Sequence, residues 1–190
     1  MENIHELIES LHLDSYLTID DIPELDLYMD QVIQLFERKY ADTKRNEEEK
    51  ILTKTMINNY AKGKLFFPVK NKKYTKEHIM LISMVYQMKS ALSINDIKKV
   101  LDIANNDTFD LEGLYKSYEN ISENNVNRFK EQSLQINAEV AEEVSSDEED
   151  MLYKKQLLMV ASFTHMSNVY RRAAEKIVDQ MEEGQQSKKE

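Results

Sequence analysis

Eight lysines and no acidic residue lie between residues 50 and 76, in a chain of 190 residues whose formal net charge is -10. The rest of the chain holds the other 17 of the 25 basic residues and all 35 acidic residues, a net charge of -18. A lysine ammonium is a mobile point charge that neutralises phosphate without the planar, bidentate contact of arginine. This lysine island therefore predicts contact with the phosphate backbone of duplex DNA.

Several side chains of the island are candidates for defined roles on DNA. The lysines expected at phosphates are Lys54, Lys62, Lys64, Lys72 and Lys73. Asn58 and Asn59 could read bases, because an amide can pair bidentately with adenine in the major groove. Other candidate contacts are Thr55 and the hydroxyls of Tyr60 and Tyr74, although both rings could instead pack within the domain. The alternative for the lysines is a merely solvated surface, with Asn59 capping or packing.

The expected scaffold for these residues is a helix followed by a wing. Thr53 or Thr55 can cap a helix that runs to about Lys62, and Gly63 can end it. The following segment, "LFFPVKNKKYT", has apolar and aromatic residues on both sides of Lys70-Asn71. Asn tolerates the positive φ of a hairpin turn, and an edge strand can accept Pro68. We therefore expect a short two-stranded wing.

Further helices are expected on both sides of the island. Residues 2–13 have amphipathic helical spacing, and Pro23 is expected to open a helix that ends near Tyr40 and carries Leu27, Val32, Leu35 and Phe36 toward the core. Thr75 is expected to cap a helix after the wing. Ser93 and Asp96 form a capping-box pattern for the next helix, which runs to about Ala104.

The C-terminal half predicts a short helix around Leu114, Tyr115 and Tyr118 and then two longer helices. Apolar positions step by three and four residues over 126–140 and again over 160–181, as in coiled coils. These stripes could pack on each other as a hairpin within one chain, or one of them could pair with a second subunit. Between them, Ser146 and Glu149 form another capping-box pattern. Residues 184–190 are expected to be disordered.

Composition restricts the remaining classes of function. Three glycines, two prolines and no cysteine favour long helices and exclude disulfides, thiolate metal sites and cysteine nucleophiles. The four histidines lack metal-ligand spacing, and three glycines cannot build a phosphate loop. No apolar run approaches the ~20 residues of a membrane span. We expect a cytoplasmic protein that is not an enzyme, with no cofactor, no metal and no membrane partner.

Four short segments resemble the MerR-type winged helix-turn-helix in the order of their parts. They are Met56-Ile57-Asn58-Asn59-Tyr60, Lys64-Leu65, Lys72-Lys73-Tyr74 and Ser93-Ile94-Asn95-Asp96-Ile97. Asn58 stands where MerR-type recognition helices typically have arginine. In addition, "LDLYMDQVI" followed by "MINNYAKGKLFFPVKNKKYT" resembles the uncharacterised bacterial family called domain of unknown function 1836, over roughly residues 20–103. The resemblance implies a MerR-like fold, no established activity, and dimerisation through a helix beyond the DNA-binding part.

Together these patterns predict an all-α protein with a short two-stranded wing. We expect a MerR-like helix-turn-helix domain with an N-terminal helix over residues 1–105, and a helical, partly coiled-coil-like region over residues 106–183 for dimerisation or regulation. The expected function is transcriptional regulation, with duplex DNA as partner and a homodimer formed through the C-terminal helices. The alternative is a protein-interaction module on the same scaffold that binds an acidic protein and no DNA.

Overall fold

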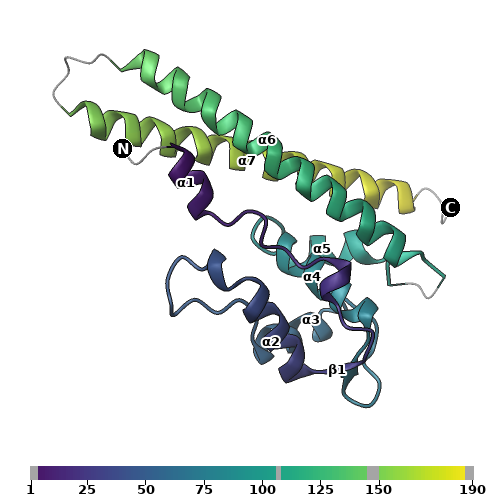
Figure 1. Ribbon diagram of the computed structural model, residues 1–190. Coiled ribbons are helices and arrows are strands. Elements are labelled where there is room, and N and C mark those ends of the chain that lie inside the picture. Colours follow the sequence, from purple (N-terminus) through teal and green to yellow (C-terminus); the bar gives the residue numbers. More distant parts are fainter. Residues whose placement is uncertain (1–3, 106–107, 145–149, 187–190) are drawn as a thin grey trace.

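Helices make up most of the computed structural model, which describes residues 4–105, 108–144 and 150–186. Two long helices lie side by side as an antiparallel hairpin, and the shorter helices form a body below them (Figure 1). The predicted mostly helical fold with a short two-stranded sheet is confirmed. Among the described residues, no helix combines the length and the apolar composition needed to cross a lipid bilayer.

The body is built around α4. The helices of the body are α2 (Met29–Lys39), α3 (Lys54–Lys62), α4 (Lys76–Met88) and α5 (Ile94–Leu101). Ile79, Met80, Leu81, Ile82 and Val85 of α4 are all buried, so α4 is apolar on most of its circumference and is the central helix of this part. The main core extends along the chain from Leu17 to Tyr115 and therefore includes every element of the lysine island.

Local capping fixes the ends of these helices as predicted. The Thr53 hydroxyl accepts a hydrogen bond from the backbone N–H of Met56 at 3.1 Å and so starts α3. The Ser93 hydroxyl accepts from the N–H of Asp96 at 3.2 Å and starts α5. Gly63 follows α3 as expected, but the left-handed residue at this helix end is Lys64, with a φ of 56°.

The predicted start of the second helix is wrong. Residues 19–21 form a 3-10 turn (η1, Ile19–Asp21), residues 27–28 form strand β1 (Leu27–Tyr28), and α2 begins only at Met29. The reason is a cap, because the backbone N–H of Tyr28 donates to the Gln31 side chain at 2.8 Å. Leu27 therefore belongs to the sheet and does not face the core from a helix.

The partner of the wing strand also differs from the prediction. Strand β2 (Lys73–Tyr74) pairs antiparallel with β1, so that Leu27 lies opposite Tyr74 and Tyr28 opposite Lys73. The segment before the turn contributes only an isolated bridge between Lys70 and Lys73. The two-stranded sheet thus joins the residues before α2 to the residues before α4.

The C-terminal half contains two long helices. The predicted short helix and first long helix are one continuous α6 (Leu111–Glu143), because no glycine or proline interrupts residues 114–143. Helix α7 spans Met151–Gln186, so residues 184–186, predicted as part of a disordered tail, are helical. Residues 187–190 and the expected capping box at Ser146 and Glu149 lie outside the described residues.

Helices α6 and α7 pack on each other within the chain, which is one of the two arrangements that the stripes allowed. The rings of Phe129 and Phe163 are 5.9 Å apart between centroids. The stripe predicted for α7 is only partly correct. Met159 and Val178 are buried, whereas the predicted positions Val160, Tyr170 and Ile177 are exposed.

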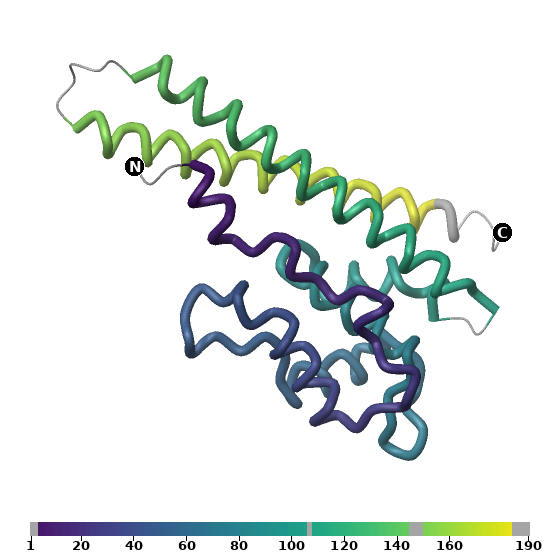
Figure 2. Tube along the Cα trace, viewed as in Figure 1, coloured from purple at the N-terminus to yellow at the C-terminus, as the bar shows by residue number. Residues whose placement is uncertain are grey.

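Helix α6 enters the main core through Leu111 and Tyr115, and the hairpin contacts the rest of the chain at two further places. Helix α1 (Ile4–Ser10) packs on it through a small second core in which Ile4 and Ile8 meet Val140 and Met159. Figure 2 shows the N-terminal segment, in purple, running from this contact down to the body. At the other place, Lys99 of α5 forms an ion pair with Glu182 of α7 at 2.6 Å.

Candidate nucleic-acid interface

Helix α3 presents one polar face to solvent. Ile57 and Tyr60 are buried, and they anchor the opposite face in the main core. The exposed side chains on α3 include five of the predicted contacts: Lys54, Thr55, Asn58, Asn59 and Lys62. No acidic residue occurs in α3. The helix therefore offers lysines for phosphates and two amides for base edges on one surface.

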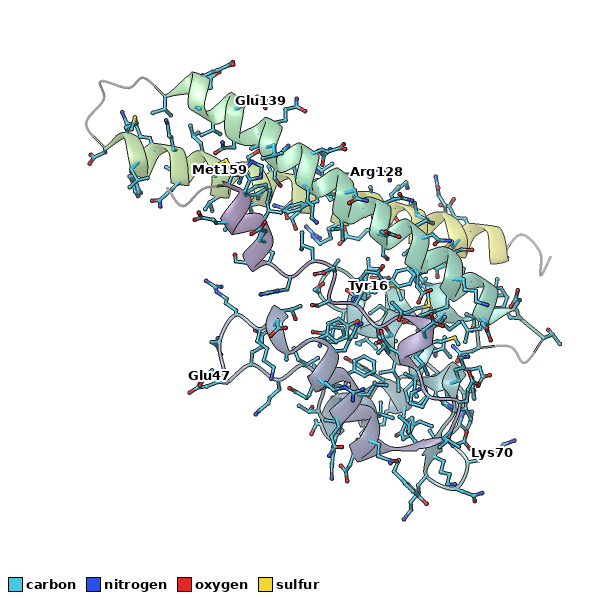
Figure 3. The ribbon with its side chains drawn as sticks, in the orientation of Figure 1. Tyr16, Glu47, Lys70, Arg128, Glu139 and Met159 are labelled. Carbon is cyan, nitrogen blue, oxygen red and sulfur yellow. The ribbon has the colours of Figure 1, made fainter. Side chains whose placement is uncertain are left out.

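The wing ends in a tight turn that directs two lysines outward. Asn71 and Lys72 have φ angles of 52° and 60°, and the N–H of Lys73 donates to the carbonyl of Lys70 at 2.9 Å. Two consecutive positive φ angles are typical of the type I′ turn that closes hairpins. Lys70 and Lys72 are exposed, and Figure 3 labels Lys70 on this loop, on the side of the body away from the hairpin.

Lys73 is held closer to the body than the other two lysines of the turn. It is half-buried, and its Nζ lies 5.7 Å from the centroid of the Tyr28 ring. A cation over an aromatic face is attracted by the ring quadrupole. Lys73 is therefore partly engaged within the chain, and the outermost charges of the turn are Lys70 and Lys72.

A groove joins α3 to the turn. It has a volume of about 440 Å³, and the residues that line it are Tyr28, Met29, Asp30, Lys54, Val69, Lys72 and Tyr74. Lys54 at the start of α3 and Lys72 in the turn thus line the same groove although they are far apart in sequence. Of the predicted lysines, the structure therefore brings Lys54 of α3 and Lys72 of the turn to one groove.

Acidic side chains from the segment before α2 and from the first turn of α2 pair with lysines of the island, which sequence reasoning missed. Asp30 pairs with Lys54 at 2.8 Å, and Glu24 pairs with Lys76 at 2.6 Å. The hydrogen bond that the Lys76 ammonium donates to the Glu24 carboxylate raises the pKa of Lys76. The acidic stretch at residues 20–30 was the sequence feature that could have predicted these ion pairs. No local pattern, however, indicated that β1 would bring this stretch beside the island. Six of the eight lysines of the island have no ion pair with any described acid: Lys50, Lys62, Lys64, Lys70, Lys72 and Lys73.

Tyr60 and Tyr74 were predicted as possible contacts with DNA, but both side chains are buried. Tyr60 is 3% exposed and Tyr74 is 5% exposed, and burial raises the pKa of both phenols. The Tyr60 hydroxyl is buried and has no hydrogen-bond partner among the described residues. The Tyr74 ring meets Phe66 edge-on at 6.2 Å between centroids. Both residues belong to the core that supports α3 and the turn, which was the alternative interpretation.

His78 holds the two ends of the wing together, a role that the sequence did not reveal. Its Nδ1 accepts a hydrogen bond from the Thr75 backbone N–H at 3.1 Å, and its Nε2 lies 3.1 Å from the carbonyl oxygen of Phe67. The unprotonated Nδ1 assigns the proton to Nε2, which donates to that carbonyl. Burial lowers the pKa of His78, in keeping with a neutral imidazole.

Comparison with known proteins identifies one family. The family model described as "Domain of unknown function (DUF1836)" matches residues 17–123. The match contains α2, α3, the turn, α4 and α5, and it ends within α6. No curated protein and no solved structure matches the chain.

Proposed function

This chain belongs to the DUF1836 family, whose model matches more than half of it, and we propose that it is a DNA-binding transcriptional regulator. The proposed contact surface consists of the exposed face of α3 and the turn at residues 70–73. The whole surface lies inside the family match. We propose a cytoplasmic location for the chain.

The observation that carries the proposal is the groove lined by both Lys54 of α3 and Lys72 of the turn, with further exposed lysines on the same two segments of the chain. Lys62 ends α3, Lys64 follows it, and Lys70 and Lys72 lie in the turn; none of the four has an ion pair with a described acid. Each ammonium that neutralises a phosphate releases counterions and adds to affinity. The rest of the chain has a net charge of -18 and disfavours diffuse binding, whereas this surface is suited to approach a polyanion.

Sequence preference is assigned to Asn58 and Asn59. Both are exposed in the middle of α3, between Lys54 at its start and Lys62 at its end. With the flanking lysines at phosphates, the two amides would face the major groove, where Asn pairs bidentately with adenine. Each such pair discriminates against the wrong base by about 1–3 kcal/mol.

The order of elements supports a MerR-like winged helix-turn-helix. A strand, two helices, a turn with a second strand and two further helices follow one another, and β1 pairs with β2 across the helix pair. The connection between α2 and α3 spans residues 40–53 and includes a 3-10 turn, η2 (Ala41–Thr43), so it is longer than the three or four residues of a tight helix-turn-helix. We therefore assign the MerR-like arrangement with an enlarged connection.

The outer face of α7 supports a homodimer. Large apolar side chains remain exposed after the hairpin has formed, among them Leu157, Val160, Tyr170 and Ile177. Residues 151–174 contain four lysines and arginines and no acid, whereas α6 contains seven acids against three lysines and arginines. In a twofold dimer, α7 of each copy would face α6 of the other with complementary charge.

Selection of bound duplexes from a random pool tests the proposed function. We expect enrichment of a defined sequence by the wild-type chain. Asn58→Ala should weaken the preference for that sequence, while Asn127→Ala, which removes an exposed amide from α6, should not. If the folded chain binds no duplex even at low salt, the rival function applies, in which the lysine surface binds an acidic protein.

A further inference from the structure

Tyr28 exposes about half of its side chain on the two-stranded sheet. It is 54% exposed, whereas Leu27 beside it packs against the main core. Successive side chains of a strand point to opposite faces, so β1 turns Leu27 inward and Tyr28 outward. A tyrosine in this position offers both an aromatic face and a hydroxyl to a partner.

The backbone around Tyr28 is fixed on both sides. Its N–H donates to the Gln31 side chain at 2.8 Å, and α2 begins at the next residue, Met29. In the sheet, Tyr28 lies directly opposite Lys73 of β2. Tyr28 therefore stands at the junction of a sheet and a helix, and such rigid elements hold a contact residue more precisely than a loop does.

The ring of Tyr28 also holds a lysine of the turn. Residues directly opposite each other in an antiparallel pair carry their side chains on the same face of the sheet. Lys73 accordingly places its Nζ 5.7 Å from the centroid of the Tyr28 ring, and it has no ion pair with any described acid. The attraction between cation and ring therefore determines where this ammonium lies on the outer face of the sheet.

The same tyrosine lines the groove between α3 and the turn. Lys54 of α3 and Lys72 of the turn line this groove together with Tyr28. Asp30 lines it too, but its charge is offset by the ion pair with Lys54. A DNA phosphate neutralised by Lys54 or Lys72 would therefore meet a phenol in the same groove. A phenol hydroxyl donates a hydrogen bond and phosphate oxygens accept one, so the two groups are complementary.

We propose that Tyr28 is a contact residue of the DNA interface, in which its hydroxyl donates a hydrogen bond to one backbone phosphate and its ring positions Lys73. This assignment rests on the proposed function, and it gives the interface a tyrosine other than the buried Tyr60 and Tyr74. A phenol is neutral, so its hydrogen bond adds affinity without releasing a counterion. The contribution of Tyr28 can therefore be distinguished from that of the lysines by its salt dependence.

Two substitutions at Tyr28 separate the hydroxyl from the ring. Tyr28→Phe keeps the ring and should weaken binding to the selected duplex about three- to tenfold, with the slope of log affinity against log salt concentration unchanged. Tyr28→Leu also removes the ring and should weaken binding by a further factor of about two to five, because Lys73 loses its anchor. Tyr153→Phe removes a 65% exposed phenol from α7 and should bind like the wild type. Circular dichroism verifies that each variant is folded.

Methylphosphonate substitution tests whether the hydroxyl contacts a phosphate directly. Each modified duplex carries one methylphosphonate, in which a methyl group replaces a charged phosphate oxygen. At one position of the backbone, this replacement should weaken binding of the wild type more than binding of Tyr28→Phe, because the variant has already lost the contact. If Tyr28 had only a structural role, the ratio of the two affinities would be the same at every position.

The anchoring of Lys73 is measured without DNA. In NMR spectra, the Hε protons of Lys73 should show an upfield ring-current shift in the wild type and in Tyr28→Phe. The shift should be absent in Tyr28→Leu. Equal chemical shifts in all three chains would refute the positioning of Lys73 by the ring.

The outcomes separate the role of Tyr28 from the proposed function. If the folded wild type binds duplex but Tyr28→Phe binds it equally well, or if no methylphosphonate affects the two chains differently, the phosphate contact is refuted while the regulator stands. If the folded wild type binds no duplex even at low salt, the proposed function and the contact are refuted together. The NMR measurement still decides in that case whether the ring positions Lys73.

Discussion

Lys54 Nζ lies 2.8 Å from Asp30 Oδ1, so the first lysine of α3 meets an acid from the first turn of α2 at the groove beside the turn. Both side chains are largely exposed, at 65% and 67%. An exposed pair of this kind contributes about 0–1 kcal/mol to stability. Its main effect is on the surface potential, because Asp30 offsets one charge of the proposed DNA interface.

Asp30→Asn should strengthen DNA binding. Without the carboxylate, Lys54 is free to pair with a phosphate, and the slope of log affinity against log salt concentration should steepen by up to about one unit. Titration of a duplex at several salt concentrations measures both effects. Glu139→Gln changes the net charge equally on α6, far from the turn in Figure 3, and is the control. Equal effects of the two variants would show that only the overall charge matters.

Tyr60→Phe should keep DNA binding intact and leave the free energy of unfolding unchanged or raise it by on the order of 1 kcal/mol. The hydroxyl removed is buried and has no hydrogen-bond partner in the described part of the chain. Tyr115→Phe is the contrast, because its hydroxyl donates to the Leu17 carbonyl at 2.7 Å and lies 2.9 Å from Ser83 Oγ. The free energy of unfolding of Tyr115→Phe should fall by about 1–3 kcal/mol. Urea denaturation measures the stability of the two variants. If the folded Tyr60→Phe variant binds DNA more weakly than the wild type, Tyr60 does contact DNA.

His78 should make stability depend on pH below neutrality. Burial lowers its pKa in the folded chain, although Glu77 and Asp26 oppose the shift. The unfolded chain therefore takes up the proton more readily, so the contribution of the neutral imidazole is complete above about pH 6.5 and declines as the pH falls through the folded pKa. Denaturation of wild type and His78→Gln between pH 5 and 8 tests this. If the two show equal pH dependence, His78 is not responsible.

Ile177→Glu should convert the proposed dimer to a monomer without unfolding the hairpin. Ile177 is 58% exposed, so the charge is tolerated in the single chain but would be buried unpaired in a dimer. Val178→Glu is the matched contrast, because Val178 is 3% exposed and its replacement should destabilise the fold itself. Light scattering and circular dichroism separate the two effects. A monomeric wild type would refute this interface.

Local features of the fold could be predicted from the sequence. Thr53 and Ser93 each cap a helix by accepting a hydrogen bond from a residue three positions later. Both members of each pair therefore lie close together in the sequence, where the pattern can be recognised. The positive φ of Asn71 follows likewise from its own side chain. The exposed face of α3 was predictable for the same reason, because it depends on helical periodicity alone.

Features that depend on distant pairing could not be predicted. The pairing of Tyr28 with Lys73 brings residues 20–30 beside the island, and no local pattern specifies that partner. The burial of Tyr60 and Tyr74 follows from the same packing. In α7, a strict coiled-coil repeat predicted Val160 and Ile177 on the buried side, but the contacts of the folded hairpin bury their neighbours Met159 and Val178.

The most direct test of the central claim is the salt dependence of duplex binding by wild type and by the double variant Lys70→Ala/Lys72→Ala. Both lysines are exposed in the turn and have no ion pair with a described acid. We predict that the slope of log affinity against log salt concentration flattens by up to about two units. The double variant Lys130→Ala/Lys176→Ala, with the same charge change on the hairpin, should keep the wild-type slope. Equal slopes for all three chains, or no duplex binding by folded wild type at low salt, would contradict the proposed interface.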